Sequence, residues 1–232
     1  MKVIGIIPAR YGSTRFPGKP LAMIGTKTMI QRTYQQVLKS SLDAVVVATD
    51  DQRIFDEVLR FGGKAVMTRA DHQSGTDRCR EALDLVGGGY DAVVNIQGDE
   101  PFIDPRQIDQ VADLIRRDDT CLATLAKRIT DAAKLNNPNV VKVVFDLEGN
   151  ALYFSRQPID TFHHIGIYAY KADTLRAIAD LPVGRLERAE RLEQLRWLEN
   201  GLRIRVAVTE VQDNISIDTP QDLLNIPKEL CQ

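Results

Sequence analysis

The chain has 232 residues, 44% of them hydrophobic, which is enough apolar material for one large α/β domain. Thirty basic residues nearly balance thirty-two acidic ones, giving a formal net charge of −2. This balance argues against a protein that coats nucleic acid. The three cysteines are widely spaced and form no Cys-x-x-Cys pair, so we expect free thiols in a reducing compartment. No apolar run is long enough to cross a bilayer, and we expect a cytoplasmic protein without membrane insertion.

The first half of the chain alternates short apolar runs with helical periodicity, the pattern of βαβ units on a mostly parallel sheet. The apolar runs predict buried strands at residues 3–7, 44–48, 64–67 and 91–96. Helical periodicity predicts helices at residues 29–38, 52–60, 77–86 and 105–117. This half is therefore expected to form a three-layer α/β core.

The second half carries longer strand patterns, which predict a mixed sheet. The predicted strands lie at residues 122–129, 140–145, 151–154, 164–170 and 206–208. Helices are predicted at residues 172–180 and 186–200. A capping box beginning at Thr219 opens a terminal helix.

No linker, internal repeat or low-complexity tract divides the chain, so we expect a single α/β domain spanning residues 1–232. Its core comprises residues 1–121 and 171–232. Residues 122–170 form a mixed-sheet extension of that core. Such an extension is a natural place for a substrate wall or a dimer contact.

The loop of residues 8–20, which follows the first predicted strand, is suited to binding phosphate. Its glycines let the backbone approach a ligand closely, and backbone N–H groups and fixed cations then meet the anion. The cations of the loop are Arg10, Arg15 and Lys19. Lys19 is followed by proline, so the loop is neither a nucleoside-triphosphatase P-loop nor a dinucleotide fingerprint. A solvated basic loop is the alternative.

Polar residues also follow two neighbouring strands, at the sheet edge where ligands of parallel α/β proteins collect. Asp50 and Asp51 follow the strand predicted at 44–48, where helix capping is the main alternative to a functional role. Further along, Ser74 could cap the next predicted helix, and Arg78 adds a charged donor. Capping and ligand binding are both open for these two residues.

Gln97, Asp99 and Glu100 follow the strand predicted at 91–96. Carboxylates exposed beside a phosphate loop indicate Mg²⁺, which prefers oxygen ligands and bridges phosphates. A charged turn before a helix is the alternative. Asp218 precedes the terminal helix, where by itself it reads as a cap, but together with Asp99 it becomes a candidate second ligand.

These motifs, in this order, resemble the family of Kdo cytidylyltransferases (3-deoxy-manno-octulosonate cytidylyltransferases, or CMP-Kdo synthetases). The resemblance spans nearly the whole chain, and its motifs lie at residues 8–20, 48–51, 74–78, 95–101, 163–168, 192–196 and 217–220. It implies a Rossmann-like nucleotidyltransferase core and a homodimer. It also implies a Mg²⁺-dependent reaction of lipopolysaccharide biosynthesis, in which CTP and Kdo give CMP-Kdo and pyrophosphate.

The resemblance further implies roles for particular residues. The nucleotide ligands would be Arg10, Ser13, Lys19, Ser74, Arg78 and Gln97, the first three on the CTP phosphates. The metal ligands would be Asp99 and Asp218. The sugar acid would be bound by Gln97, His164, Glu190 and Gln194. Catalysis would rest on Arg10, Lys19 and Asp99, which position the reactants and stabilise charge.

Two further expectations concern the sugar acid. Its carboxylate needs a cation, and Arg156 is the candidate. Glu190, Glu193, Gln194 and Trp197 are spaced to share one face of a single helix that could bind polyol hydroxyls. A solvated helix face is the alternative.

The chain departs from the family between Arg156 and His164, where the connection is shorter than usual. Either residues are deleted or a loop is absent from the sequence, which leaves the sugar specificity open. Ser216 also replaces a usual glycine. The alternatives are transfer to an amino-substituted Kdo or a sialic acid, a non-catalytic nucleotide-binding regulatory module, and a structural interaction protein. Asp99 and Asp218 argue against the module, which would not need acidic ligands.

Overall fold

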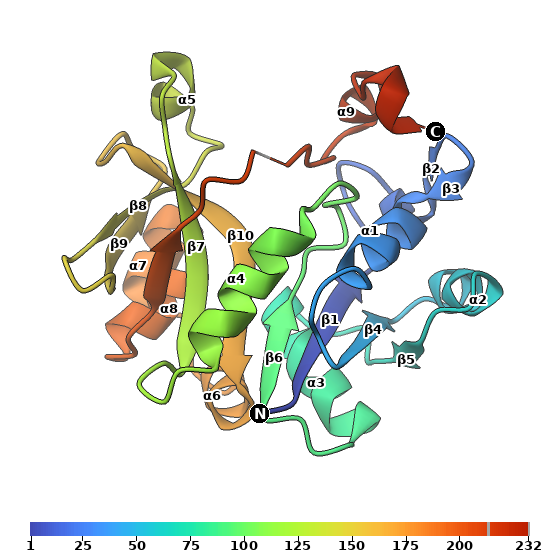
Figure 1. Ribbon diagram of the computed structural model, residues 1–232, viewed down its shortest axis with the longest axis horizontal. Coiled ribbons are helices and arrows are strands. Elements are labelled where there is room, and N and C mark those ends of the chain that lie inside the picture. The colour runs from blue at the N-terminus through green and yellow to red at the C-terminus, as the bar shows by residue number, and fades with distance from the viewer. Residues whose placement is uncertain (213, 232) are drawn as a thin grey trace. The chain divides into compact units, whose positions relative to one another are not determined.

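The computed structural model describes residues 1–212 and 214–231 (Figure 1). The chain forms two compact units, one comprising Met1–Asp109 and Val211–Gln232, the other Gln110–Glu210. The expected extension at residues 122–170 falls within the second unit. That the whole chain behaves as one domain stays a prediction.

The first unit is built on four parallel strands. In spatial order they are β6 (Ala92–Asn95), β1 (Val3–Ala9), β4 (Ala44–Thr49) and β5 (Ala65–Met67). Ile6 of β1 is opposite Val46 on one side and Asn95 on the other. The β1 interior is almost fully buried, as expected for a central parallel strand of apolar residues. The predicted α/β fold with a mostly parallel sheet is confirmed.

Helices occur at the predicted places in this part of the chain, each begun by a polar side chain. They are α1 (Met29–Val37), α2 (Gln52–Arg60), α3 (Gly75–Val86), α4 (Pro105–Ile115) and α9 (Pro220–Leu224). The Asp51 side chain accepts from the Arg53 N–H, and Ser74 and Thr219 each begin a capping box. Four short elements of this unit were not predicted from the sequence: η1 (Lys19–Leu21), β2 (Met23–Ile24), β3 (Lys27–Thr28) and η2 (Lys228–Cys231). In the second unit, the short helix α5 (Ala132–Asn136) was not predicted either.

The second unit contains a mixed sheet, as the strand patterns predicted. Its strands are β7 (Leu122–Arg128), β8 (Lys142–Phe145), β9 (Ala151–Ser155), β10 (Phe162–Lys171) and β11 (Arg205–Val208). β7 pairs parallel with β11 and antiparallel with β10, while β8 and β9 form a hairpin. Its remaining helices are α5 (Ala132–Asn136), α6 (Ala172–Ala179), α7 (Arg185–Glu190) and α8 (Gln194–Glu199).

A short connection joins β9 to β10. Within it the Ile159 N–H donates to the Gln157 carbonyl oxygen at 2.9 Å. The Ile129 N–H donates to the Thr161 carbonyl oxygen at 2.7 Å. The second bond ties the connection to the residue that follows β7.

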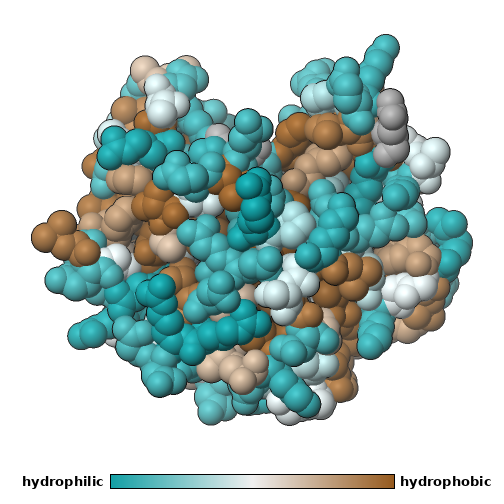
Figure 2. Space-filling view, in the orientation of Figure 1, coloured by the Kyte–Doolittle hydropathy of each residue, from teal (hydrophilic) through white to brown (hydrophobic). Residues whose placement is uncertain are grey.

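The surface is mainly polar on the face drawn in Figure 2, with apolar side chains gathered in smaller patches between hydrophilic ones. In the part of the chain that the structure describes, no helix combines the length and the apolar character that a membrane span requires. All three cysteines are free thiols, as predicted.

The helix predicted at residues 186–200 is wrong, because the chain breaks it at Arg191. This residue adopts a left-handed conformation with φ 56°, which separates α7 from α8. Across the break, the Arg196 guanidinium binds the Glu187 carboxylate through two hydrogen bonds of 2.7 Å. Nine residues of continuous helix would hold these two side chains about 13.5 Å apart along the axis. Glu190 and Gln194 therefore belong to different helices, and the shared helical face does not exist.

We expect Arg191→Gly to raise the free energy of unfolding by about 1 kcal/mol, because glycine adopts positive φ without the Cβ clash. The matched control, Arg188→Gly, lies inside α7 and should lower it by about 1 kcal/mol. Urea denaturation of both variants measures the two changes. Equal destabilisation by both would mean that the left-handed conformation at Arg191 carries no strain.

Candidate functional site

A cavity of about 240 Å³ opens in the first unit, at the carboxyl-terminal edge of its parallel strands. Its walls come from the loop after β1, the loop before α3, the loop after β6 and the segment before α9. They contain eight residues that the sequence analysis assigned to the nucleotide and the metal: Arg10, Ser13, Lys19, Ser74, Arg78, Gln97, Asp99 and Asp218. The convergence of these distant motifs is the central structural finding for the site.

The loop after β1 folds back on itself, and this fold places Lys19 in the cavity wall. Gly18 has φ 71°, and its N–H donates to the Tyr11 carbonyl oxygen at 2.9 Å. A Cβ atom at Gly18 would lie 2.9 Å from the Tyr11 ring. Only glycine combines that conformation with that close approach.

Gly98 gives the loop after β6 a similar close approach to β1. A Cβ atom there would lie 3.1 Å from the Pro8 carbonyl oxygen. The absence of a side chain at Gly98 therefore lets the loop after β6 lie against the end of β1. Asp99, the next residue, reaches the cavity beside Lys19.

The Lys19 ammonium joins the two predicted metal ligands. Its Nζ lies 2.6 Å from Asp99 Oδ2 and 3.4 Å from Asp218 Oδ1. Arg15 adds a second cation, with Nη2 3.1 Å from the same Asp218 oxygen. Two carboxylates that would otherwise repel each other are thus held around one positive charge.

The segment that carries Asp218 is docked directly on the loop that carries Asp99. The backbone N–H of Ile217 donates to the Asp99 carbonyl oxygen at 3.1 Å, and the Ile217 side chain is fully buried. Ile217 belongs to a small apolar cluster with Ile24, Met29 and Ile226. Burial of this cluster therefore fixes where Asp218 lies.

Asp99 and Asp218 are suited to a magnesium ion that completes its shell with phosphate oxygens and water. Among residues 1–212 and 214–231, no group of three His, Cys, Asp or Glu side chains could hold a metal alone. Glu100 does not line the cavity, and its Oε2 is buried without a hydrogen-bond partner. Burial, and then the nearby Asp99 charge, raise the pKa of Glu100 to about 8. The donor set is therefore two carboxylates, and it fits a metal that is bound together with its nucleotide.

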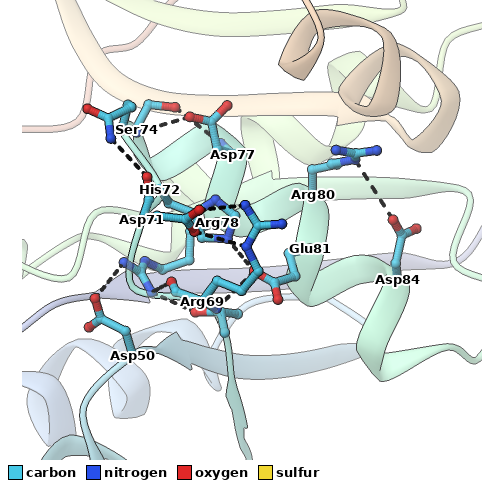
Figure 3. A network of polar contacts seen from close by, with 12 residues as sticks. Asp50, Arg69, Asp71, His72, Ser74, Asp77, Arg78, Arg80, Glu81 and Asp84 are labelled. Carbon is cyan, nitrogen blue, oxygen red and sulfur yellow. Dashed lines mark hydrogen bonds and ion pairs between the residues drawn. The ribbon is translucent and has the colours of Figure 1, made fainter.

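Arg78 forms another wall of the cavity, and Asp50 holds it there (Figure 3). Only 3% of Arg78 is exposed. Its Nη2 lies 3.0 Å from Asp50 Oδ2, and its Nη1 donates to Thr68 Oγ1 at 2.6 Å. Of the two acids after β4, Asp51 is thus the helix cap and Asp50 is the partner of Arg78.

His72 and Gln73 also line the cavity and were not predicted from the sequence. His72 Nε2 contacts Glu81 Oε2 on α3, and Glu81 also accepts from the Arg69 N–H at 3.0 Å (Figure 3). Burial alone would raise the pKa of Glu81, but these hydrogen bonds outweigh it and hold the pKa below its usual value. The only signal in the sequence was that both residues directly precede Ser74.

Four predicted sugar ligands, Arg156, His164, Glu190 and Gln194, belong to the second unit, whereas Gln97 belongs to the first. The structure brings Arg156 and Glu190 together. The Glu190 carboxylate accepts from Ser155 Oγ at 2.8 Å and from the Arg156 N–H at 3.2 Å. Glu190 therefore fastens the end of β9, and its contact with a sugar stays a prediction. Gln194 is largely buried at the start of α8.

His164 lies against aromatic rings in the second unit. Its Nε2 is 2.9 Å from Thr124 Oγ1, and the Phe154 ring meets it edge-on at 5.3 Å between centroids. Loss of water around the ring, and then repulsion from His163, lower the pKa of His164 to about 3. The ring is therefore neutral at physiological pH, so it would contact a ligand as a hydrogen-bonding group rather than as a cation.

Comparison with known proteins identifies the class of protein to which this site belongs. Residues 4–204 match the model of the cytidylyltransferase family, and the chain belongs to that family. It is 54% identical to the 3-deoxy-manno-octulosonate cytidylyltransferase of Parabacteroides distasonis, covering 96% of each chain. It is 50% identical to the 8-amino-3,8-dideoxy-manno-octulosonate cytidylyltransferase of Shewanella frigidimarina, again covering 96% of each.

A solved structure supports the same grouping. It is CMP:2-keto-3-deoxy-manno-octonic acid synthetase complexed with CTP, and it superimposes with a TM-score of 0.93 at 43% identity. The match covers 99% of this chain and 98% of that one. The resemblance to the Kdo cytidylyltransferases is thereby confirmed.

We expect His164→Gln to flatten the pH dependence of stability in acid. The wild-type ring has a folded pKa below its unfolded value near 6.5, so its contribution is present above pH 6.5 and is lost as pH falls. Relative to the variant, the wild type should lose about 1.4 kcal/mol for each pH unit well below 6.5. Urea denaturation at a series of pH values measures the difference. Parallel curves from pH 7 to pH 4 would contradict the lowered pKa.

Proposed function

We propose that this protein transfers CMP from CTP to the anomeric hydroxyl of Kdo, giving CMP-Kdo and pyrophosphate. The observation that carries the proposal is Lys19 held between Asp99 and Asp218 in the cavity of the first unit. Membership of the cytidylyltransferase family and the Kdo-specific names of close relatives support it. We further propose that the enzyme is a cytoplasmic homodimer that serves lipopolysaccharide biosynthesis.

The residues of the cavity bind and align the nucleotide. Arg10, Ser13 and Lys19 bind the triphosphate, aided by backbone N–H groups of their loop. On nucleotide binding, the Lys19 ammonium shifts from its carboxylates towards phosphate oxygens. Ser74, Arg78 and Gln97 line the same cavity and contact the nucleoside.

The chemistry is an in-line attack of the sugar hydroxyl on the α-phosphorus, with pyrophosphate as the leaving group. Positioning and charge stabilisation suffice, and no covalent enzyme intermediate is needed. Arg10 and Lys19 offset the charge that develops on the phosphate oxygens. Asp99 and Asp218 would hold Mg²⁺, which when bound neutralises the triphosphate and lowers the pKa of the attacking hydroxyl.

The proposed ligands of the sugar acid are Gln97, Arg156, His164, Glu190 and Gln194. Arg156 supplies the cation for the Kdo carboxylate. His164, as a neutral ring, exchanges hydrogen bonds with hydroxyl groups.

A second candidate substrate is 8-amino-3,8-dideoxy-manno-octulosonate. The supporting observation is the 50% identity to an enzyme named for that sugar, which is similar to the identity with several Kdo enzymes. The two substrates differ at one position, an amine in place of a hydroxyl. Overall identity therefore does not separate them.

We expect pyrophosphate release only when CTP, Kdo and Mg²⁺ are all present. Rates with Kdo, its 8-amino analogue and a sialic acid, each tested with CTP, UTP and ATP, measure the specificity. The highest kcat/KM should fall on CTP with Kdo. A higher value with the amino sugar would favour the second candidate, and CTP-independent release would refute both.

We expect Asp99→Asn and Asp218→Asn each to lower kcat roughly 100-fold or more at saturating Mg²⁺, because each removes a charge that the metal needs. Asp118→Asn, an exposed acid distant in sequence from both, is the control and should keep wild-type rates. Thermal unfolding of the three variants shows whether the fold is intact. Near-normal turnover by a folded Asp99 or Asp218 variant would refute the metal assignment.

A further inference from the structure

Asp50 has a role that neither helix capping nor the proposed reaction explains. It lies directly after β4, where Asp51 already caps α2. Its carboxylate is mostly buried, and Oδ2 pairs with the Arg78 guanidinium at 3.0 Å (Figure 3). The two residues are 28 positions apart, so only the tertiary fold brings them together.

Three groups fix the Arg78 guanidinium in one orientation. Asp50 accepts from Nη2, while Thr68 Oγ1 and the Arg69 carbonyl oxygen accept from Nη1, at 2.6 and 3.3 Å. Thr68 is itself tied to β4, because its N–H donates to the Thr49 carbonyl oxygen at 2.8 Å. Residues at the ends of two neighbouring strands therefore hold the Arg78 side chain, which extends from α3.

The guanidinium held in this way still has N–H groups that could donate hydrogen bonds to a ligand. It has five N–H groups, and the three contacts above use both N–H groups of Nη1 and one of Nη2. In residues 1–212 and 214–231, no acceptor is bonded to the Nε–H or to the second Nη2–H. Arg78 lines the cavity, so these donors are its means of contacting a nucleotide.

Arg78 is less able than Lys19 to exchange its carboxylate partner for a phosphate group. The Asp50 carboxylate compensates the Arg78 charge in a buried setting, so Arg78 is poorly suited to gaining or losing a phosphate partner during turnover. Arg78 is better suited to donating hydrogen bonds to the uncharged edge of a nucleobase. Cytosine offers two adjacent acceptors, O2 and N3, whereas N3 of uracil carries a hydrogen. A guanidinium is a donor only, so a fixed one favours cytosine over uracil.

We propose that Asp50 is a positioning residue that, through Arg78, sets the preference of the cavity for cytosine over uracil nucleotides. The proposal rests on the proposed function, since it takes the nucleotide to be CTP. It adds a particular origin for the selectivity, which is the orientation of one guanidinium by a carboxylate behind it. Asp50 itself touches no substrate.

The test measures nucleotide binding and turnover in the full chain carrying Asp50→Asn. The variant keeps the shape of the side chain but loses the charge that holds Arg78. We expect the KM for CTP to rise roughly tenfold or more, as for loss of a charged hydrogen bond. The affinity for UTP should change less, so the ratio of CTP to UTP affinity should fall. The kcat at saturating CTP and the KM for the sugar acid should stay near wild type.

Two further variants keep the proposal falsifiable. Thr68→Val removes the second anchor of the guanidinium and should lower the CTP to UTP ratio in the same direction. Asp56→Asn, an exposed acid of α2, is the matched control and should change neither nucleotide constant. Calorimetric binding of CTP and UTP without sugar supplies a readout that does not depend on which sugar is used.

The outcomes separate this proposal from the proposed function. Loss of CTP preference on binding, with Kdo turnover intact at saturation, supports both. An unchanged CTP to UTP ratio in a folded Asp50→Asn variant overturns the positioning role and leaves the proposed function standing. A wild-type protein that binds CTP but does not act on sugar acids would overturn the proposed function while the role of Asp50 is still decided by binding.

Discussion

The site depends on one electrostatic constraint, the ammonium of Lys19 lying between the carboxylates of Asp99 and Asp218. Two carboxylates brought this close repel each other, and the attraction of each to the lysine ammonium offsets that repulsion. The rest of the first unit supplies the geometry: a backward-folded loop for Lys19, a glycine that lets β1 and the Asp99 loop meet, and a buried isoleucine that docks the Asp218 segment. The cavity is thus charge-compensated before any ligand arrives.

The same pairing of cation and carboxylate serves two purposes in this cavity, and solvent exposure separates them. Asp218 is half-exposed and has two cationic partners, so in the proposed reaction its charges can be exchanged for a metal and phosphates. Asp50 and Arg78 are mostly buried, which makes their pairing costly to break. An exchangeable pair suits catalysis, whereas a fixed pair suits recognition of a base. Both lie at the edge where the parallel strands end.

Much of this arrangement was predictable because its causes are local or topological. Apolar runs between turn residues predicted β1 and β4, and the Thr219 capping box marked the start of α9. The carboxyl ends of parallel strands meet at one edge of a sheet, so polar residues placed there were expected to converge. Asp99 lies at this edge because it follows strand β6. Asp218 lies there only because the neighbouring Ile217 is buried in the apolar cluster of the first unit.

The sequence by itself therefore determined the parallel α/β fold, the phosphate-suited loop and the identity of the two acidic residues. The tertiary structure alone decided three other features. It broke the helix at Arg191, and an ion pair between Glu187 and Arg196 spans the break. It assigned Asp50 to Arg78 rather than to a cap, and it placed His72 on the cavity wall. In each case the partner lies nine or more residues away, and periodicity or capping rules carry no information about contacts between such distant side chains.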